Sequence, residues 1–286
     1  MSTHAISAPA ITEIGPPETR RGSVLGDVWV VARRGLLHMR REPEALADAT
    51  FQPVMFVLLF AYVFGGAITV PGGGSYREFL MGGIFAQTIV FGGSFGVAMA
   101  IASDRKNGAM DRFRSLPMAR GAVLGGHALA NLLKAALPMA LMSICGLVVG
   151  WRIHTDVLHA AAGYGLLVVF AFAMIWIGVL LGSMLSSPEA VQGVAFVAIF
   201  PITFIASTFV PTSSLPGVLK TFAEWNPVTS LAGSLRSLFG NPGADPAAGA
   251  PWSLHHPVAY TLLCSAAIIV ICAPIAVQRY QRSVAG

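Results

Sequence analysis

The stretch VLHAAAGYGLLVVFAFAMIWIGVLLGSMLSS, residues Val157–Ser187, decides the fold class of this protein. It contains no Asp, Glu, Lys or Arg and lies between Asp156 and Glu189. A helix needs about 20 predominantly apolar residues to cross the hydrocarbon core of a bilayer. The stretch is longer than this, so it predicts a helix that spans a membrane.

Uncharged stretches of comparable length lie on both sides of it. We predict six spanning helices, at residues 51–70, 79–103, 121–149, 157–186, 190–210 and 256–278. Of these, the third alone contains a charged residue, Lys134. The sequence therefore predicts an all-α integral membrane protein, with a transmembrane domain over residues 23–286 that follows a flexible cytoplasmic N-terminus, residues 1–22.

The composition of the whole chain agrees with a bilayer as its main solvent. Of the 286 residues, 55% are hydrophobic and 11% are charged, whereas soluble domains carry about 25% charged residues. So few charges argue against a soluble enzyme, a disordered chain, a coiled coil and a nucleic-acid-binding domain. We interpret the net charge of +5 as an orientation signal, with no nucleic-acid partner.

The distribution of Lys and Arg predicts that both termini are cytoplasmic. With that orientation, most of the 18 basic residues lie in cytoplasmic segments, and Lys134 lies within a span. The outside loops hold four: Arg77, Arg152, Lys220 and Arg236. Cytoplasmic loops of membrane proteins carry the excess of Lys and Arg, which fixes this topology.

Two segments outside the spans have helical apolar spacing. Residues 24–42 carry apolar residues on one side and arginines on the other, which predicts an interfacial helix whose arginines face anionic headgroups. The alternative is a helix packed on a soluble partner. Residues 211–240 contain two short amphipathic helices, which predict a re-entrant or surface-lying external hairpin. The interfacial arginines are Arg33, Arg34, Arg40 and Arg41.

Catalytic and metal-binding motifs are weak or missing. No GxxxxGK[ST] motif occurs, so any ATP must be bound by another chain. Residues Gly92–Gly96 match GxSxG around Ser94, but they lie within a span and lack the strand–helix context of a hydrolase. We interpret Gly92 and Gly96, like Gly178 and Gly182, as positions of close helix packing, with catalysis as the alternative. No His or Cys spacing indicates a metal site.

Lys134 has two interpretations. A charge inside a membrane is costly and often functional, so it could line a polar cavity. Alternatively, its long side chain reaches the cytoplasmic interface or pairs structurally.

The loop after the second span, DRKNGAMDRFRSLPMAR at residues 104–120, combines basic residues with an apolar stripe. Charge alone allows a purely topological role. The apolar stripe within a charged helix, residues 104–117, favours docking into the groove of a partner. The apolar residues are Met110, Phe113 and Leu116, and the charged ones include Arg112 and Arg114.

This loop resembles the ABC-2 type permease family, the membrane subunits of ATP-binding-cassette exporters. The matching positions are Asp104, Arg105, Gly108, Leu116, Pro117 and Arg120. Asp104 stands where many members have Glu. Further similar stretches are Phe209–Pro211 with Trp225–Pro227 and Leu235–Arg236, and Ser186–Ala190. Among these permeases the chain is most similar to the daunorubicin-resistance kind.

The resemblance implies a coupling helix at residues 104–117 that docks on an ATPase. It also implies two permease copies around the pore, a homodimer, and two ABC ATPase subunits that bind ATP and magnesium. This chain itself would hold no cofactor and no metal.

We therefore expect a permease subunit of an ATP-driven exporter in the plasma (inner) membrane, and not an enzyme. It would move an amphipathic or hydrophobic small molecule or lipid, such as a drug in antibiotic resistance, among membrane lipids. Candidate path residues on the second and fifth spans are Phe91, Phe95, Phe200 and Phe204, with Lys134 on the third. The alternatives are an ion-coupled secondary transporter, a membrane hydrolase built on Ser94 and a scaffold without transport.

Overall fold

The computed structural model describes residues 51, 53–70, 72–107, 120–185, 187–243, 245–246 and 249–285, with the backbone alone for 120–127 and 280–285. Every regular element in these residues is a helix. Five of the helices are long and apolar enough to cross a membrane. The predicted all-α integral membrane fold is therefore confirmed.

The five helices lie within the predicted uncharged stretches or extend slightly beyond them. The membrane-crossing segments are Tyr76–Lys106, Ala128–Val149, Val157–Met184, Pro188–Ile205 and Pro257–Arg279. Within the first predicted span, 51–70, the described residues include an apolar helix Pro53–Val63, shorter than the other five. Its last turn is a π-helix, η1 (Leu59–Val63). After it the chain turns at Gly65–Ala67, so this helix ends before the predicted boundary.

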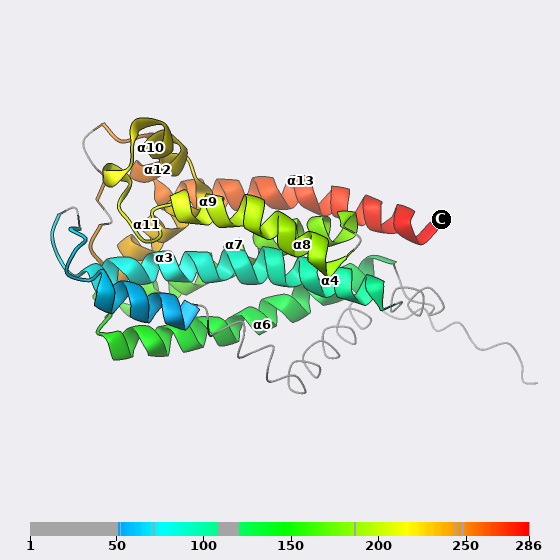
Figure 1. Ribbon diagram of the computed structural model, residues 1–286, viewed down its shortest axis with the longest axis horizontal. Helices are drawn as coiled ribbons and strands as arrows, with labels where there is room; N and C mark the ends of the chain where they lie inside the picture. Colours follow the sequence, from blue (N-terminus) through cyan, green and yellow to red (C-terminus); the bar gives the residue numbers. More distant parts are fainter. Residues whose placement is uncertain are drawn as a thin grey trace, which may run out of the picture.

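The helices run side by side along the long axis of the molecule (Figure 1). α3 (Tyr76–Val90), η2 (Phe91–Gly96) and α4 (Val97–Lys106) form one continuous helix. It packs against α7 (Val157–Met184), which also packs against α13 (Pro257–Ala285). α6 (Arg120–Val149) contacts α3 and α7.

The two ends of the bundle differ. At one end, which we call the hairpin end, lie α10 (Gly217–Glu224), α11 (Pro227–Phe239) and α12 (Trp252–His255) (Figure 1). The opposite end, the α4 end, holds the last turn of α4 and the first turn of α8 (Pro188–Val194). The helix of α8 continues through η3 (Ala195–Ile199) into α9 (Phe200–Ile205).

Aromatic rings form the core near the hairpin end. The rings of Phe85, Trp151 and Phe239 are almost fully buried, with centroids 5.5–6.2 Å apart. The indole N–H of Trp151 donates to Asn241 Oδ1 at 2.7 Å, so its polar atom is paired despite burial. These contacts join α3 and α11 to the loop between α6 and α7.

Glycines allow α7 to approach the second-span helix closely. A Cβ on Gly178 would lie 2.6 Å from the carbonyl oxygen of Ser94, and one on Gly182 would lie 2.9 Å from that of Ala98. On the opposing helix the close glycine is Gly93, where a Cβ would lie 2.7 Å from Met174 Cβ. The predicted packing role therefore holds for Gly178 and Gly182.

For Gly92 and Gly96 the prediction of close packing is wrong among the helices that the structure describes in one chain. Among the described residues, a Cβ on Gly92 would meet nothing within 4 Å, and one on Gly96 would meet a single atom of Phe91, at 4.0 Å. Both glycines lie in η2, where the wider helical turn rotates residues away from the positions that α-helical spacing predicts. Ser94 is buried, and its hydroxyl donates to the carbonyl oxygen of Val90 within its own helix.

The hairpin is defined by its capping residues. Asn226 accepts a hydrogen bond from the Val228 backbone N–H, and Pro227 follows at the first helical position of α11. Gly240 ends α11 with a φ of 69°, a left-handed conformation that favours glycine. The Asn226 side-chain amide also donates to the Ile202 carbonyl at 2.7 Å, which ties the hairpin to the fifth span.

Candidate functional site

The α4 end brings together the ends of three helices. Lys106 Nζ donates to Glu189 Oε1 at 2.8 Å, which links α4 to α8. Arg105 Nη1 donates to the carbonyl oxygen of Ser183, in the last turn of α7, at 3.2 Å. This joint comes directly before residue 108, so it adjoins the loop in which the sequence predicts the coupling helix.

Some of the predicted coupling residues belong to the joint. Asp104 and Arg105 lie in the last turn of α4, and Arg120 begins α6. The other predicted coupling residues lie outside the described residues, as do residues 24–42 and their four arginines. Those coupling residues are Gly108, Met110, Arg112, Phe113, Arg114, Leu116 and Pro117. The predicted functions of these residues therefore remain predictions.

Sequence reasoning did not include Lys106, Ser183 and Glu189 in the site. The signal was present for the charged pair, because Lys106 ends the second span and Glu189 begins the fifth on the same side. Side chains at these positions are within reach of each other if the two helices are neighbours, and the structure places them in contact.

The second and fifth spans are interrupted by π-helical segments in the middle. η2 includes Gly92, Gly93 and Gly96, and the Ser94 hydroxyl bonds back to its own helix, which competes with regular α-helical hydrogen bonding. η3 ends two residues before Pro201, whose ring would clash with the Val197 carbonyl, four residues earlier, in a regular α-helix. Such π segments are frequent at functional sites.

A cluster of phenylalanine rings joins the first and fifth spans, and we call it the phenylalanine cluster. The rings of Phe200 and Phe204 stack with centroids 4.0 Å apart, and Phe204 lies 5.0 Å from Phe209. From the helix Pro53–Val63, Phe60 stacks on Phe209 at 4.3 Å and Phe56 lies 6.0 Å from Phe204. Two of the predicted path residues, Phe200 and Phe204, therefore lie in one cluster.

Three members of the cluster were not predicted as path residues: Phe56, Phe60 and Phe209. The signal was again in the sequence, because Phe56 and Phe60 have the same four-residue spacing as Phe200 and Phe204. Residues four apart lie on one face of a helix.

The other predicted path residues lie elsewhere. Phe91 and Phe95 are half-buried and pack against the core, and among the described rings neither pairs with Phe200 or Phe204. Lys134 is half-buried on α6 and interacts with a partner group. The structure thus brings Phe200 and Phe204 together. Within one chain, the path residues predicted on the second span do not pair with those on the fifth span.

The fifth span lies at the periphery of the described bundle. In its most apolar segment 17% of the residues are buried, against 61% in that of the second span. Phe196, Val197 and Ile202 are exposed, at 64%, 79% and 41%. The phenylalanine cluster therefore adjoins an apolar surface that faces away from the core.

Comparison with known proteins identifies relatives over most of the chain. Residues 26–239 match the sequence model of the ABC-2 type transporter family. The daunorubicin resistance ABC transporter permease protein DrrB1 of Streptomyces coeruleorubidus is 28% identical over 264 residues, which cover 92% of this chain and 87% of that protein. The probable doxorubicin resistance ABC transporter permease protein DrrC of Mycobacterium tuberculosis is 24% identical over 252 residues, covering 87% and 86%. The putative transport permease ycf38 of Cyanophora paradoxa is 21% identical over 218 residues, covering 75% and 74%.

Proposed function

The chain belongs to the ABC-2 type transporter family, and from this premise we propose that it is the permease subunit of an ATP-driven exporter in the plasma membrane. Two separate ABC ATPase subunits bind and hydrolyse ATP with magnesium. Two copies of the permease form the pore among membrane lipids, with both termini in the cytoplasm. The observation that carries this proposal is the family match over residues 26–239.

The substrate of the proposed exporter is an amphipathic or hydrophobic molecule, such as a drug, a lipid or a glycolipid. The names of two relatives refer to resistance to daunorubicin and doxorubicin, which supports a drug. The apolar surface beside the phenylalanine cluster supports the same class, because it offers aromatic contacts without charge.

In the proposed mechanism, the segment 104–117 docks on the ATPase and moves when the ATPase dimer closes. Movement of this segment acts first on the last turn of α4. The Lys106–Glu189 and Arg105–Ser183 contacts carry the movement to the fifth and fourth spans. The bond from Asn226 to Ile202 carries the motion of the fifth span to the hairpin.

The proposed substrate path lies between two permease copies, along the second and fifth spans. The π segments η2 and η3 are the places where these helices can change their hydrogen-bonding pattern at least cost. The phenylalanine cluster adjoins η3, so a local change in the fifth span displaces its rings.

The docking role is tested by changing Arg112 and Arg114 together to Glu in the reconstituted complex. The double variant is expected to show at least about tenfold lower substrate-stimulated ATPase activity. Reversing two charges weakens docking by more than about 1.4 kcal/mol, which corresponds to a tenfold lower affinity. Membrane insertion, measured by the yield of folded permease, is expected to be unchanged.

Arg152→Glu is the control, because Arg152 lies at the hairpin end and is outside the proposed interface. It is expected to keep stimulated activity near the wild-type level. Full stimulation in the Arg112→Glu/Arg114→Glu variant would refute the docking role.

A further inference from the structure

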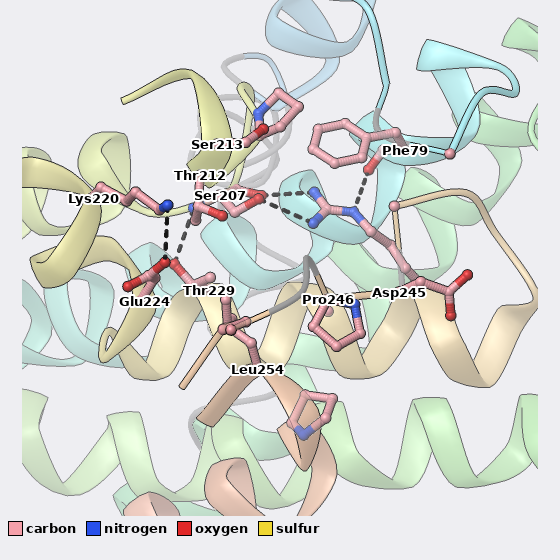
Figure 2. A pocket seen from close by; sticks show the side chains of 18 residues that line it. Phe79, Ser207, Thr212, Ser213, Lys220, Glu224, Thr229, Asp245, Pro246 and Leu254 are labelled. Atoms are coloured by element: carbon pink, nitrogen blue, oxygen red, sulfur yellow. Dashed lines mark hydrogen bonds and ion pairs between the residues drawn. The ribbon is translucent and has the colours of Figure 1, made fainter. Parts of the chain in front are cut away.

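The turn after the fifth span, residues 206–209, is held by buried hydrogen bonds from two helices. Arg236 of α11 is 2% exposed. Its Nη2 donates to the Ser207 carbonyl at 2.7 Å, and its Nη1 donates to Ser207 Oγ at 3.3 Å. Its Nε donates to the Phe79 carbonyl of α3 at 2.9 Å, and Figure 2 shows these bonds as dashed lines at Ser207 and Phe79. Each nitrogen of the guanidinium therefore donates within the fold and joins α11 and α3 to the turn.

A second buried donor, Tyr76, holds the far end of the same turn. Tyr76 is 4% exposed, and its hydroxyl donates to the Phe209 carbonyl at 2.9 Å. The α3 backbone also touches the turn directly, because a Cβ on Gly83 would overlap the Thr208 carbonyl oxygen. The start of the second span and the end of the fifth are thus fixed to each other.

On one side the turn borders a cavity of about 350 Å³, which we call the Arg236 cavity (Figure 2). Ser207, Thr229 and Arg236 line it, and Thr229 Oγ1 accepts from the Ser207 backbone N–H at 3.0 Å. Because the cavity adjoins Ser207, close packing does not fix the turn on this side. The hydrogen bonds therefore determine its position, and their loss would let the turn move toward the cavity.

The turn carries Phe209, the buried member of the phenylalanine cluster. The centroid of its ring lies 4.3 Å from that of Phe60, 5.0 Å from that of Phe204 and 5.5 Å from that of Phe56. Phe209 is 3% exposed, whereas these three residues and Phe200 are half-buried. A molecule beside the bundle can thus reach the four outer rings, while Phe209 supports them from the core.

Half-exposed rings in this arrangement suit a planar aromatic ligand. Aromatic groups prefer offset-stacked or edge-to-face contacts with centroids about 4.5–7 Å apart, so such a ligand needs ring faces at fixed positions. A site held rigid before binding also binds more tightly, because less motion is lost on binding. Phe196, which is 64% exposed, continues the aromatic surface, with its ring 6.3 Å from that of Phe200.

We infer that the phenylalanine cluster binds a planar aromatic group of the substrate, and that Tyr76 and Arg236 are positioning residues for it. Both act through the turn 206–209 and Phe209, and neither touches the substrate. The inference rests on the proposed function, since it places the substrate on the predicted path residues Phe200 and Phe204. It adds the buried hydrogen bonds that keep the rings in a binding arrangement.

The test measures binding of doxorubicin, a planar aromatic probe, to the purified transporter complex in detergent without nucleotide. Binding is followed by the change in doxorubicin fluorescence. Tyr76→Phe removes one hydroxyl and keeps the ring that stacks on Phe79. It leaves the Phe209 carbonyl without this donor, so the turn is held less firmly. We expect the Kd for doxorubicin to rise about three- to tenfold.

Tyr164→Phe is the matched control. The Tyr164 hydroxyl lies 2.7 Å from Ser143 Oγ and joins α7 to α6. Its ring contacts Phe85 and Phe239 and, among the described rings, no member of the phenylalanine cluster. Both variants are expected to lower the midpoint of thermal unfolding by similar amounts, but only Tyr76→Phe is expected to weaken binding. Equal losses of affinity in the two variants would indicate general loosening and would overturn the inference.

Two further variants locate the bound probe and test Arg236. Phe200→Leu keeps an apolar side chain but removes the aromatic face, so it is expected to weaken binding at least about tenfold. Arg236→Gln removes the guanidinium that joins Phe79 to Ser207, and it is expected to weaken binding more than Tyr76→Phe does. Tyr76→Phe keeps the inference testable if Arg236→Gln does not fold.

The outcomes separate this inference from the proposed function. A wild-type complex that binds no doxorubicin would overturn the inference, as would unchanged affinity in Tyr76→Phe or in Phe200→Leu. ATP-driven transport of another hydrophobic molecule would then still support the proposed function. Conversely, binding that weakens as expected, without any ATP-driven transport, would support the inference and contradict the proposed function.

Discussion

The close contact between α7 and the second span depends on the absence of a methyl group at Gly178. A Cβ at Gly178 would lie 2.6 Å from the Ser94 carbonyl oxygen and 2.7 Å from that of Gly93. Gly178→Ala must therefore push α7 away from the second span. We expect it to destabilise the protein by about 1–3 kcal/mol, the usual range for overpacking, measured as a lower midpoint of thermal unfolding in detergent.

Gly165→Ala is the control on the same helix. A Cβ there would meet no atom of the described residues within 4 Å, and alanine favours the helix by up to about 1 kcal/mol over glycine. We expect its unfolding midpoint to equal or exceed that of wild type. If Gly178→Ala were as stable as Gly165→Ala, the close contact would not exist in the protein.

Single residues also show why sequence reasoning partly failed at the GxSxG segment. Gly92 and Gly96 are four apart, so α-helical spacing places them on one face. The structure instead brings Gly93 against α7, because the segment Phe91–Gly96 is π-helical. Residue spacing alone does not show whether a membrane helix has α-helical or π-helical hydrogen bonds. It does indicate the general packing role of Gly178 and Gly182.

At the scale of elements, the contact between Lys106 of α4 and Glu189 of α8 couples the movements of these two helices in the proposed mechanism. Lys106→Glu or Glu189→Lys alone places like charges side by side at the present 2.8 Å contact. We expect each to lower substrate-stimulated ATPase activity several-fold, and the charge-swapped double variant to restore most of it. Both side chains are more than half exposed, so the free energy of unfolding should change little.

The readout for this exchange is the ratio of stimulated to basal ATPase activity in proteoliposomes. Basal activity of the partner should be the same in all three variants, which controls for the amount of assembled complex. A double variant no better than the worse single variant would show that the contact does not transmit motion.

Pro201 sets the hydrogen-bonding pattern of the fifth span. Pro201→Ala returns a backbone N–H and removes the ring that would clash with the Val197 carbonyl in a regular α-helix, so η3 should shift toward that form. We expect a higher unfolding midpoint and slower transport, because the fifth span loses its easily deformed segment. Thermal unfolding and substrate transport are measured on the same preparation.

Pro274→Ala in α13 is the matched control, since Pro274 also lies inside a spanning helix but has no π segment beside it. It is expected to gain stability with transport unchanged. Faster transport in Pro201→Ala would contradict the proposed role of η3.

At the level of elements, the sequence locates helices well and their ends less well. The predicted segment 121–149 corresponds to Arg120–Val149, and 157–186 to Val157–Met184, because the gap between charges sets the length of an apolar helix. The fifth helix ends at Ile205 and not at residue 210. The next residues form the turn that receives Arg236, which is a tertiary contact and leaves no local signal.

At the scale of the whole molecule, the two ends of the bundle are built differently. The α4 end holds the exposed polar joint next to the predicted docking segment, and the hairpin end holds the Arg236 cavity. Sequence reasoning predicted the docking segment from charge and apolar spacing, but it did not predict the contacts of the joint beside it. It could not predict the cavity, because Phe79, Ser207 and Arg236 are far apart in the chain and meet only in the folded structure.

The phenylalanine cluster shows the same limit. The spacing of Phe200 and Phe204 was sufficient to place them on one face of the fifth span. The ring contacts of Phe204 with Phe56 and of Phe209 with Phe60 depend on the position of another helix, which the sequence does not give.

Transport into inside-out vesicles decides whether a separate ATPase drives this permease. Vesicles containing the permease and its ATPase subunits are loaded with doxorubicin in the presence of ATP, and the partner is compared with a variant unable to hydrolyse ATP. We predict uptake that requires ATP and both chains and that disappears with the inactive partner. Uptake by the permease alone, driven by an ion gradient and indifferent to ATP, would show that the protein is a secondary transporter instead.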